Sequence, residues 1–157
     1  AAADYKLDPI LVEAVVVQES SGNTDAFRFE KDFWNRYLKP KPEWAGKNPR
    51  RVSSSYGLMQ PLYVVATERG YPTNLPPEGL FVPEISLKYG CAHLRWMMDR
   101  IEAKYPTASA DSKLLASLAS YNGGSKGQMP SAPLTEPMLS PCSVITSSSR
   151  RNIRYRG

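Results

Sequence analysis

The chain has 157 residues, of which 41% are hydrophobic and 22% charged, so it is not a protein that is disordered throughout. Twenty Lys and Arg against fifteen Asp and Glu give a net charge of +5, which favours an anionic partner without naming one. No run approaches the roughly 20 apolar residues of a membrane helix, and two Cys and one His are too few for a disulfide scaffold or a His-rich metal site, so we expect no transmembrane segment, metal or cofactor.

The first predicted element is a helix from Pro9 to about Ser20. Asp8 is a good N-cap residue and Pro9 suits the first helical position. Gly22 then ends the helix, because glycine adopts the left-handed conformation found after helix C-termini.

Four further segments have helical patterns: 32–38, 61–69, 83–105 and 111–121. The longest has an apolar stripe with spacings of three and four residues, made of Leu87, Cys91, Leu94, Met98 and Ile101. Strand signals are weak, and clustered prolines mark loops. We therefore predict a mainly α domain over 1–124, with long loops and little or no sheet. Residues 125–157 are predicted to be an irregular, Ser/Pro-rich basic tail.

Glu19 stands out in the first helix because it continues an apolar face. It lies one turn after Val15 and Val16 and two turns after Val12. Partial burial and the negative end of the helix both disfavour a charged carboxylate, so we expect its pKa to be raised. A raised pKa suits a general acid near neutral pH. The alternative is a solvated glutamate at a helix end, or one paired with Arg or Lys.

Three short sequence blocks occur along the chain, and their order is informative. They are Gln18-Glu19-Ser20-Ser21-Gly22-Asn23, Ser55-Tyr56-Gly57-Leu58-Met59-Gln60 and Ala119-Ser120-Tyr121-Asn122-Gly123-Gly124. Together they resemble the catalytic domain of soluble lytic transglycosylases, which is related to goose-type lysozyme. The likeness extends over roughly 5–124. It implies a lysozyme-like helical fold and cleavage of the peptidoglycan glycan strand at the MurNAc–GlcNAc β-1,4 bond.

The resemblance also implies roles for individual residues. Glu19 matches the family's catalytic acid, which would then act as base to give a 1,6-anhydromuramic product. Gln60 matches a residue that binds the sugar, and Tyr121 one that orients the catalytic carboxyl. The other motif residues expected near the substrate are Ser20, Gly57, Met59 and Asn122. For Met59 and Leu58 the alternative is plain core packing, which we favour for Leu58.

Two stretches depart from the family pattern. The segment 23–53 is longer than usual and rich in aromatic residues, which are expected to form either a sugar-stacking wall or a satellite core. The tail 125–157 lacks the apolar period of the helix that usually follows. A hydrolase would need a second carboxylate, for which Asp25, Glu30 and Asp32 are candidates. Glu30 is the most interesting, although pairing with Arg28 is the favoured alternative.

Three classes of function remain in view. The leading one is a lytic transglycosylase. A hydrolytic muramidase of the same fold is next, and a non-catalytic glycan-binding relative follows. The expected partner is peptidoglycan and not nucleic acid. We expect a monomer that acts in the cell envelope or periplasm, or a phage-encoded protein that acts on the cell wall. Cys91 is expected to be a buried thiol, and a bridge to Cys142 requires an oxidising compartment.

Overall fold

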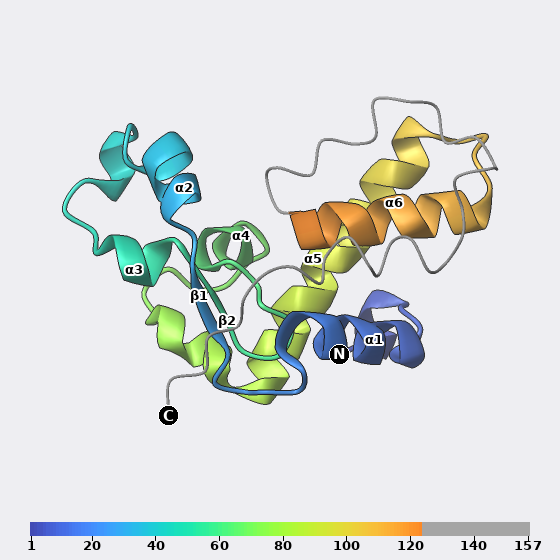
Figure 1. Ribbon diagram of the computed structural model, residues 1–157, viewed down its shortest axis with the longest axis horizontal. Coiled ribbons are helices and arrows are strands. Elements are labelled where there is room, and N and C mark those ends of the chain that lie inside the picture. Colours follow the sequence, from blue (N-terminus) through green and yellow to red (C-terminus); the bar gives the residue numbers. More distant parts are fainter. Residues whose placement is uncertain (124–157) are drawn as a thin grey trace. The chain divides into compact units, whose positions relative to one another are not determined.

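The computed structural model describes residues 1–123, and these are mostly helical (Figure 1). The chain divides into two compact units, one of residues 1–99 and one that begins at Arg100. The α-helices are α1 (Pro9–Ser20), α2 (Lys31–Phe33), α3 (Pro49–Val52), α4 (Tyr63–Glu68), α5 (Pro83–Lys104) and α6 (Ala110–Gly123). Short helical turns are η1 (Ala3–Tyr5), η2 (Trp34–Leu38), η3 (Pro42–Trp44) and η4 (Pro77–Phe81).

Helix α1 begins and ends where the sequence predicts. The Asp8 carboxylate caps it by accepting a 2.8 Å hydrogen bond from the backbone N–H of Ile10. Ser21, with φ 54°, ends the helix in the left-handed conformation, and Gly22 follows at φ 78°. The stop signal at Gly22 is therefore confirmed, with the cap one residue earlier.

A small two-stranded sheet joins distant parts of the first unit. Strand β1 (Phe27–Phe29) pairs antiparallel with β2 (Ser54–Tyr56), and Phe29 lies opposite Ser54 (Figure 1). The connection between the strands contains α2, η2, η3 and α3. The prediction of little sheet is confirmed, and this ribbon is the part that the sequence pattern did not reveal.

Helix α4 starts later than expected. Residues 61–69 were predicted to be helical with Pro61 in the first turn, whereas α4 begins at Tyr63. The Pro61 carbonyl accepts a 3.3 Å bond from the Tyr56 N–H, and Leu62 forms a bridge with Ser55. This pairing with β2 accompanies an extended backbone at Leu62 (φ −67°, ψ 131°), so α4 begins only after Leu62.

The main core of the first unit is rich in tyrosine. It is a cluster of Leu38, Val52, Tyr56, Tyr63, Val64, Ala66, Tyr71, Leu80 and Tyr89. Buried tyrosines need partners for their hydroxyl groups. Tyr56 donates to the Arg51 carbonyl at 2.6 Å and Tyr71 to the Pro76 carbonyl at 2.7 Å. Burial raises the pKa of Tyr56 to about 12, so this hydroxyl keeps its proton at neutral pH.

The second unit is described over 100–123. Ser109 caps α6: its hydroxyl accepts a 3.2 Å bond from the Ser112 N–H. Lys113 ties the start of α6 to the end of α5 through a 2.8 Å ion pair with Glu102 and a 3.0 Å bond to the Pro106 carbonyl. The predicted helix over 111–121 is thus present, one residue longer at its start and two at its end.

Candidate active site

The first motif lies at the C-terminal end of α1. Val12 and Val15 are buried on one side of this helix, and Glu19 follows on that side and is partly buried. Ser20 is the last helical residue, and its hydroxyl donates to the Val16 carbonyl at 3.1 Å. This is the local hydrogen bond expected of Ser20. By contrast, Glu13, the other glutamate of α1, is exposed.

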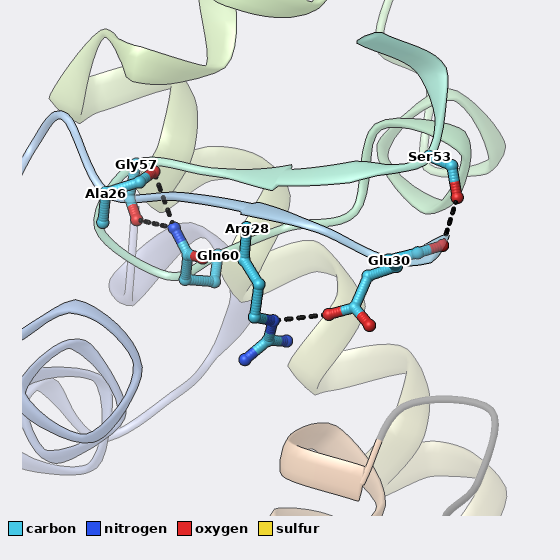
Figure 2. Close-up of polar contacts among 6 residues, drawn as sticks. All are labelled: Ala26, Arg28, Glu30, Ser53, Gly57 and Gln60. Carbon is cyan, nitrogen blue, oxygen red and sulfur yellow. Dashed lines mark hydrogen bonds and ion pairs between the residues drawn. The ribbon is translucent and has the colours of Figure 1, made fainter. Parts of the chain in front are cut away.

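The second motif is tied to the chain segment that follows the first. The Gln60 side-chain nitrogen donates to the carbonyls of Ala26 and Gly57, each at 2.9 Å (Figure 2). The Gly57 N–H also donates to the Ala26 carbonyl, at 2.8 Å. These bonds engage both hydrogens of the Gln60 amide nitrogen, so its Oε1 is the atom suited to accept from a ligand. Gln60 itself is buried and has a positive φ of 48°.

Gly57 is required by contacts within the protein. Its φ of 67° lies in the left-handed region. A Cβ placed there would lie 2.5 Å from the Leu80 carbonyl oxygen and 2.9 Å from Oγ of Ser86. We expected glycine here to let a sugar approach the backbone. The structure shows the Leu80 and Ser86 atoms in the space that a side chain would need, and approach of a sugar stays a prediction.

Met59 supports the motif loop from inside. Its side chain is fully buried and contacts Cys91, with the two sulfurs 3.8 Å apart. Helix α5 can lie this close because residue 90 is glycine; a Cβ there would overlap the Met59 side chain. Met59 therefore has the core position considered as its alternative, whereas Leu58, for which core packing was favoured, is only partly buried.

Ser86 is a supporting residue that the sequence analysis missed. It is fully buried on α5, accepts from the Met59 N–H at 3.2 Å and donates to the Tyr56 carbonyl at 3.4 Å. Ser86 and Gly90 are four residues apart and so share a helix face. The available signal was this pair of small residues within a long helix.

Glu30, the candidate second carboxylate, is paired with Arg28. Nε of Arg28 donates to Oε1 of Glu30, and in Figure 2 both side chains extend from the same side of the ribbon. The Glu30 main chain is also held by Ser53, whose hydroxyl donates to the Glu30 carbonyl at 3.0 Å. The favoured alternative for Glu30, an ion pair with Arg28, is confirmed. Asp25 is exposed on the loop before β1.

The aromatic residues of the segment 23–53 separate into two groups. Phe33, Trp34 and Trp44 pack against the tyrosine-rich core, as the satellite-core alternative predicts. Phe27 and Tyr37 keep about two fifths of their surface exposed, at 42% and 37%. Half of the six aromatic rings of the segment therefore hold it onto the first unit.

The third motif belongs to the second unit. Tyr121 and Asn122 lie in the last turn of α6, and both are partly buried. The orienting contact expected between Tyr121 and Glu19 stays a prediction. The first unit thus brings together Gly57, Met59 and Gln60, with Ala26 linking them to the end of the first motif.

The described residues contain no metal centre and no membrane span. Among residues 1–123, no group of three or more His, Cys, Asp or Glu side chains could hold a metal ion. In the same range, no helix is both long and apolar enough to cross a membrane.

Cys91 is a buried free thiol, and Cys142 lies outside the described residues. His93 stacks on Trp96, and burial lowers its pKa to about 4.

The fold and the motif positions define the class: a mainly α, lysozyme-like domain with a glutamate at the end of its first long helix. The family model described as the transglycosylase SLT domain matches residues 1–130, so the chain belongs to that family. It is therefore an enzyme of the lytic transglycosylase kind, acting on peptidoglycan. A search of curated proteins and a search of solved structures gave no match.

Proposed function

We propose that the chain cleaves the MurNAc–GlcNAc β-1,4 bond with Glu19 as its single catalytic carboxyl. Protonated Glu19 donates its proton to the glycosidic oxygen, and the bond from that oxygen to the muramic C1 breaks. The ionised carboxylate then takes the proton of the muramic C6 hydroxyl, and the oxygen of that hydroxyl bonds to C1. The product is a 1,6-anhydromuramic end, and Glu19 regains its proton.

The observation that carries this proposal is the place of Glu19 in a chain of this family. It lies on the buried side of α1, in the last turn, where the helix dipole is negative. Glu13, on the same helix, is exposed and has no comparable setting. A partly buried carboxyl at a helix C-terminus is suited to hold a proton and release it during the reaction.

The remaining motif residues are assigned supporting roles within a catalytic unit of residues 1–124. Gln60 accepts a hydrogen bond from the sugar through Oε1, because its nitrogen already binds two carbonyls. Tyr121 orients the Glu19 carboxyl, and Asn122 helps to bind the glycan. Gly57 and Met59 act indirectly, by holding the Gln60 loop in shape.

The ion pair of Glu30 supports assignment of the chain as a transglycosylase and not as a hydrolase. A hydrolytic muramidase generally uses a second carboxylate to activate water or to attack the sugar. Arg28 occupies one oxygen of Glu30, the most interesting candidate for that role, and Ser53 fixes its main chain. Intramolecular attack by the C6 hydroxyl needs no second carboxylate, which is why we place the lyase first and the muramidase second.

Glu19→Gln tests the assignment, because it removes the acidic proton and keeps the shape. We expect it to abolish release of soluble fragments from purified peptidoglycan, while circular dichroism shows an unchanged fold. Glu13→Gln, the matched change on the exposed side of α1, should cleave as the parent does. Full cleavage by Glu19→Gln would exclude the proposal. Absence of cleavage by the parent protein would favour the third candidate, a glycan-binding relative.

We further propose that the enzyme works as a monomer on the cell wall, either in the cell envelope or periplasm or as a phage-encoded protein. Membership of a family that acts on peptidoglycan supports the place of action. Neither nucleic acid nor a cofactor enters the proposed reaction.

A further inference from the structure

Positive charge is concentrated in one segment of the described chain. Residues 31–51 contain seven Lys and Arg against two Asp and Glu, a net charge of +5. The other described residues, 1–30 and 52–123, contain eight Lys and Arg against twelve Asp and Glu, a net charge of −4. We call residues 31–51 the basic segment. The excess of cations is therefore local, and the rest of the described chain is acidic.

The basic segment presents its charges to solvent. All seven of its Lys and Arg side chains are exposed. Within residues 1–123, ion pairs are recorded for two of them: Arg51 with Glu78 at 2.6 Å, and Lys41 with Glu43 at 3.9 Å. The other five, for which the described residues provide no ion pair, are Lys31, Arg36, Lys39, Lys47 and Arg50. Arg36 and Arg50 lie over the rings of Tyr37 and Phe29. Exposed cations outside these ion pairs are suited to an external anion.

The segment is held to the first unit by its apolar side chains. Leu38 is buried in the tyrosine-rich core, and Phe33, Trp34 and Trp44 pack against that core. The Arg51–Glu78 pair adds a two-pronged bond, with Nε to Oε1 at 2.8 Å and a second nitrogen to Oε2 at 2.6 Å. The basic segment is thus an anchored surface, so its charges keep a defined position on the first unit.

The β ribbon sets the distance from this surface to the Gln60 loop. One end of the ribbon, at Phe29 and Ser54, leads into the basic segment; the other end, at Phe27 and Tyr56, leads to Ala26 and Gly57 (Figure 1). Three residues of strand span about 10 Å. An extended peptide of three residues covers a similar length, about 10 Å.

We propose that the basic segment binds the carboxylates of the peptide stems that peptidoglycan carries on its muramic sugars. This inference rests on the proposed function, because it takes the glycan strand to lie at the Gln60 loop. A stem attached to a sugar at that loop is long enough to reach the basic segment. Lys and Arg there would attract stem carboxylates and strengthen binding of strands that still carry peptides.

A matched pair of triple variants of the full chain tests the proposal. The first, Lys31→Gln/Lys39→Gln/Lys47→Gln, removes three charges from the basic segment. The control, Lys6→Gln/Lys88→Gln/Lys104→Gln, removes three exposed lysines elsewhere, so both have the same net charge. Binding to insoluble peptidoglycan is measured by co-sedimentation, on intact sacculi free of phosphate-containing polymers and on glycan stripped of its stems by an amidase. Thermal unfolding confirms that both variants fold.

We expect the first variant to bind intact peptidoglycan roughly tenfold more weakly at low salt, with the loss shrinking as salt shortens the Debye length below about 10 Å. The control should remain within about twofold of the parent, and on stripped glycan the three proteins should bind alike. Equal weakening by both variants, or a loss that persists on stripped glycan, would overturn the proposal. So would a loss that appears only when phosphate-containing wall polymers are left on the sacculi.

Failure of this inference can be told from failure of the proposed function. If stems do not bind the basic segment, the parent still cleaves the stripped glycan and Glu19→Gln still does not. If the proposed function is wrong, the parent leaves even intact peptidoglycan uncut, whatever the triple variants bind.

Discussion

Replacing Gly57 with alanine should destabilise the protein strongly, because two separate penalties act at this residue. A non-glycine residue at φ 67° pays the left-handed penalty, about 1–2 kcal/mol. The added Cβ would also lie 2.5 Å from the Leu80 carbonyl oxygen and 2.9 Å from Oγ of Ser86, closer than real Cβ contacts. Overpacking of a filled interior costs about 1–3 kcal/mol. Together we expect a loss of about 2–5 kcal/mol in the free energy of unfolding.

Gly46→Ala is the matched control, because it separates the two penalties. Gly46 has a similar φ of 73°, but a Cβ there would meet nothing within 4 Å. It should lose only the backbone part, about 1–2 kcal/mol. Both variants are compared with the parent by urea denaturation followed by circular dichroism, at the same pH. If Gly57→Ala is no less stable than Gly46→Ala, the steric reasoning about Leu80 and Ser86 is refuted.

Three other predictions concern polar side chains of the first unit. Glu30→Gln should lower stability by at most about 1 kcal/mol, since its pair with Arg28 is partly exposed, and should leave the cleavage rate nearly unchanged. Ser86→Ala should cost about 1–3 kcal/mol by leaving the buried Met59 N–H without its acceptor, as measured by denaturant unfolding. Glu78→Gln should destabilise the protein at pH 7, and its deficit relative to the parent should shrink below pH 4.5.

The direction of the pH dependence expected for Glu78→Gln follows from the arginine partner of Glu78. The hydrogen bond from Arg51 lowers the pKa of Glu78 from 4.5, so the folded state favours the ionised form. That stabilisation is present above the unfolded pKa and is lost as the pH falls through the lower folded value. A deficit of Glu78→Gln that stays constant from pH 7 to pH 3 would contradict this reasoning.

The other two predictions have equally direct contrary results. A collapse in cleavage rate for Glu30→Gln, with an unchanged melting temperature, would give Glu30 a chemical role. For Ser86, the control is Ser117→Ala on α6, whose buried hydroxyl donates to the Lys113 carbonyl within its own helix at 2.7 Å. An equal loss of stability in both serine variants would show that the hydrogen bond between Ser86 and the motif loop contributes no more than a bond within one helix.

Helices were predictable where capping and apolar spacing agree. Asp8 and Pro9 marked the start of α1, and the stripe through Cys91 and Leu94 marked α5. The β ribbon was not predictable from local pattern. Its strands have three residues each and lie 27 positions apart, and β2 begins with two serines that strand preference does not favour. Such a pair of strands forms because the rest of the fold brings the two segments together, not because of their local sequence.

The motif positions were predictable, but the reasons for them were not. Gly57 and Met59 occur in a recognisable block, yet both serve internal packing: Gly57 leaves room for Ser86, and the Met59 side chain lies against Gly90. Those two residues lie some thirty positions later in the chain, and only the fold brings them to the loop. Glu30 was the reverse case: Arg28 is only two residues away, so nearness in the sequence was enough to suggest the ion pair.

The central claim is that Glu19 alone drives a non-hydrolytic cleavage, and mass spectrometry of the digested peptidoglycan tests it most directly. The parent protein should release fragments with 1,6-anhydromuramic ends, each lighter by one water than the hydrolysed form, and Glu19→Gln should release none. Fragments with reducing ends from the parent protein, or undiminished anhydro fragments from Glu19→Gln, would contradict the account.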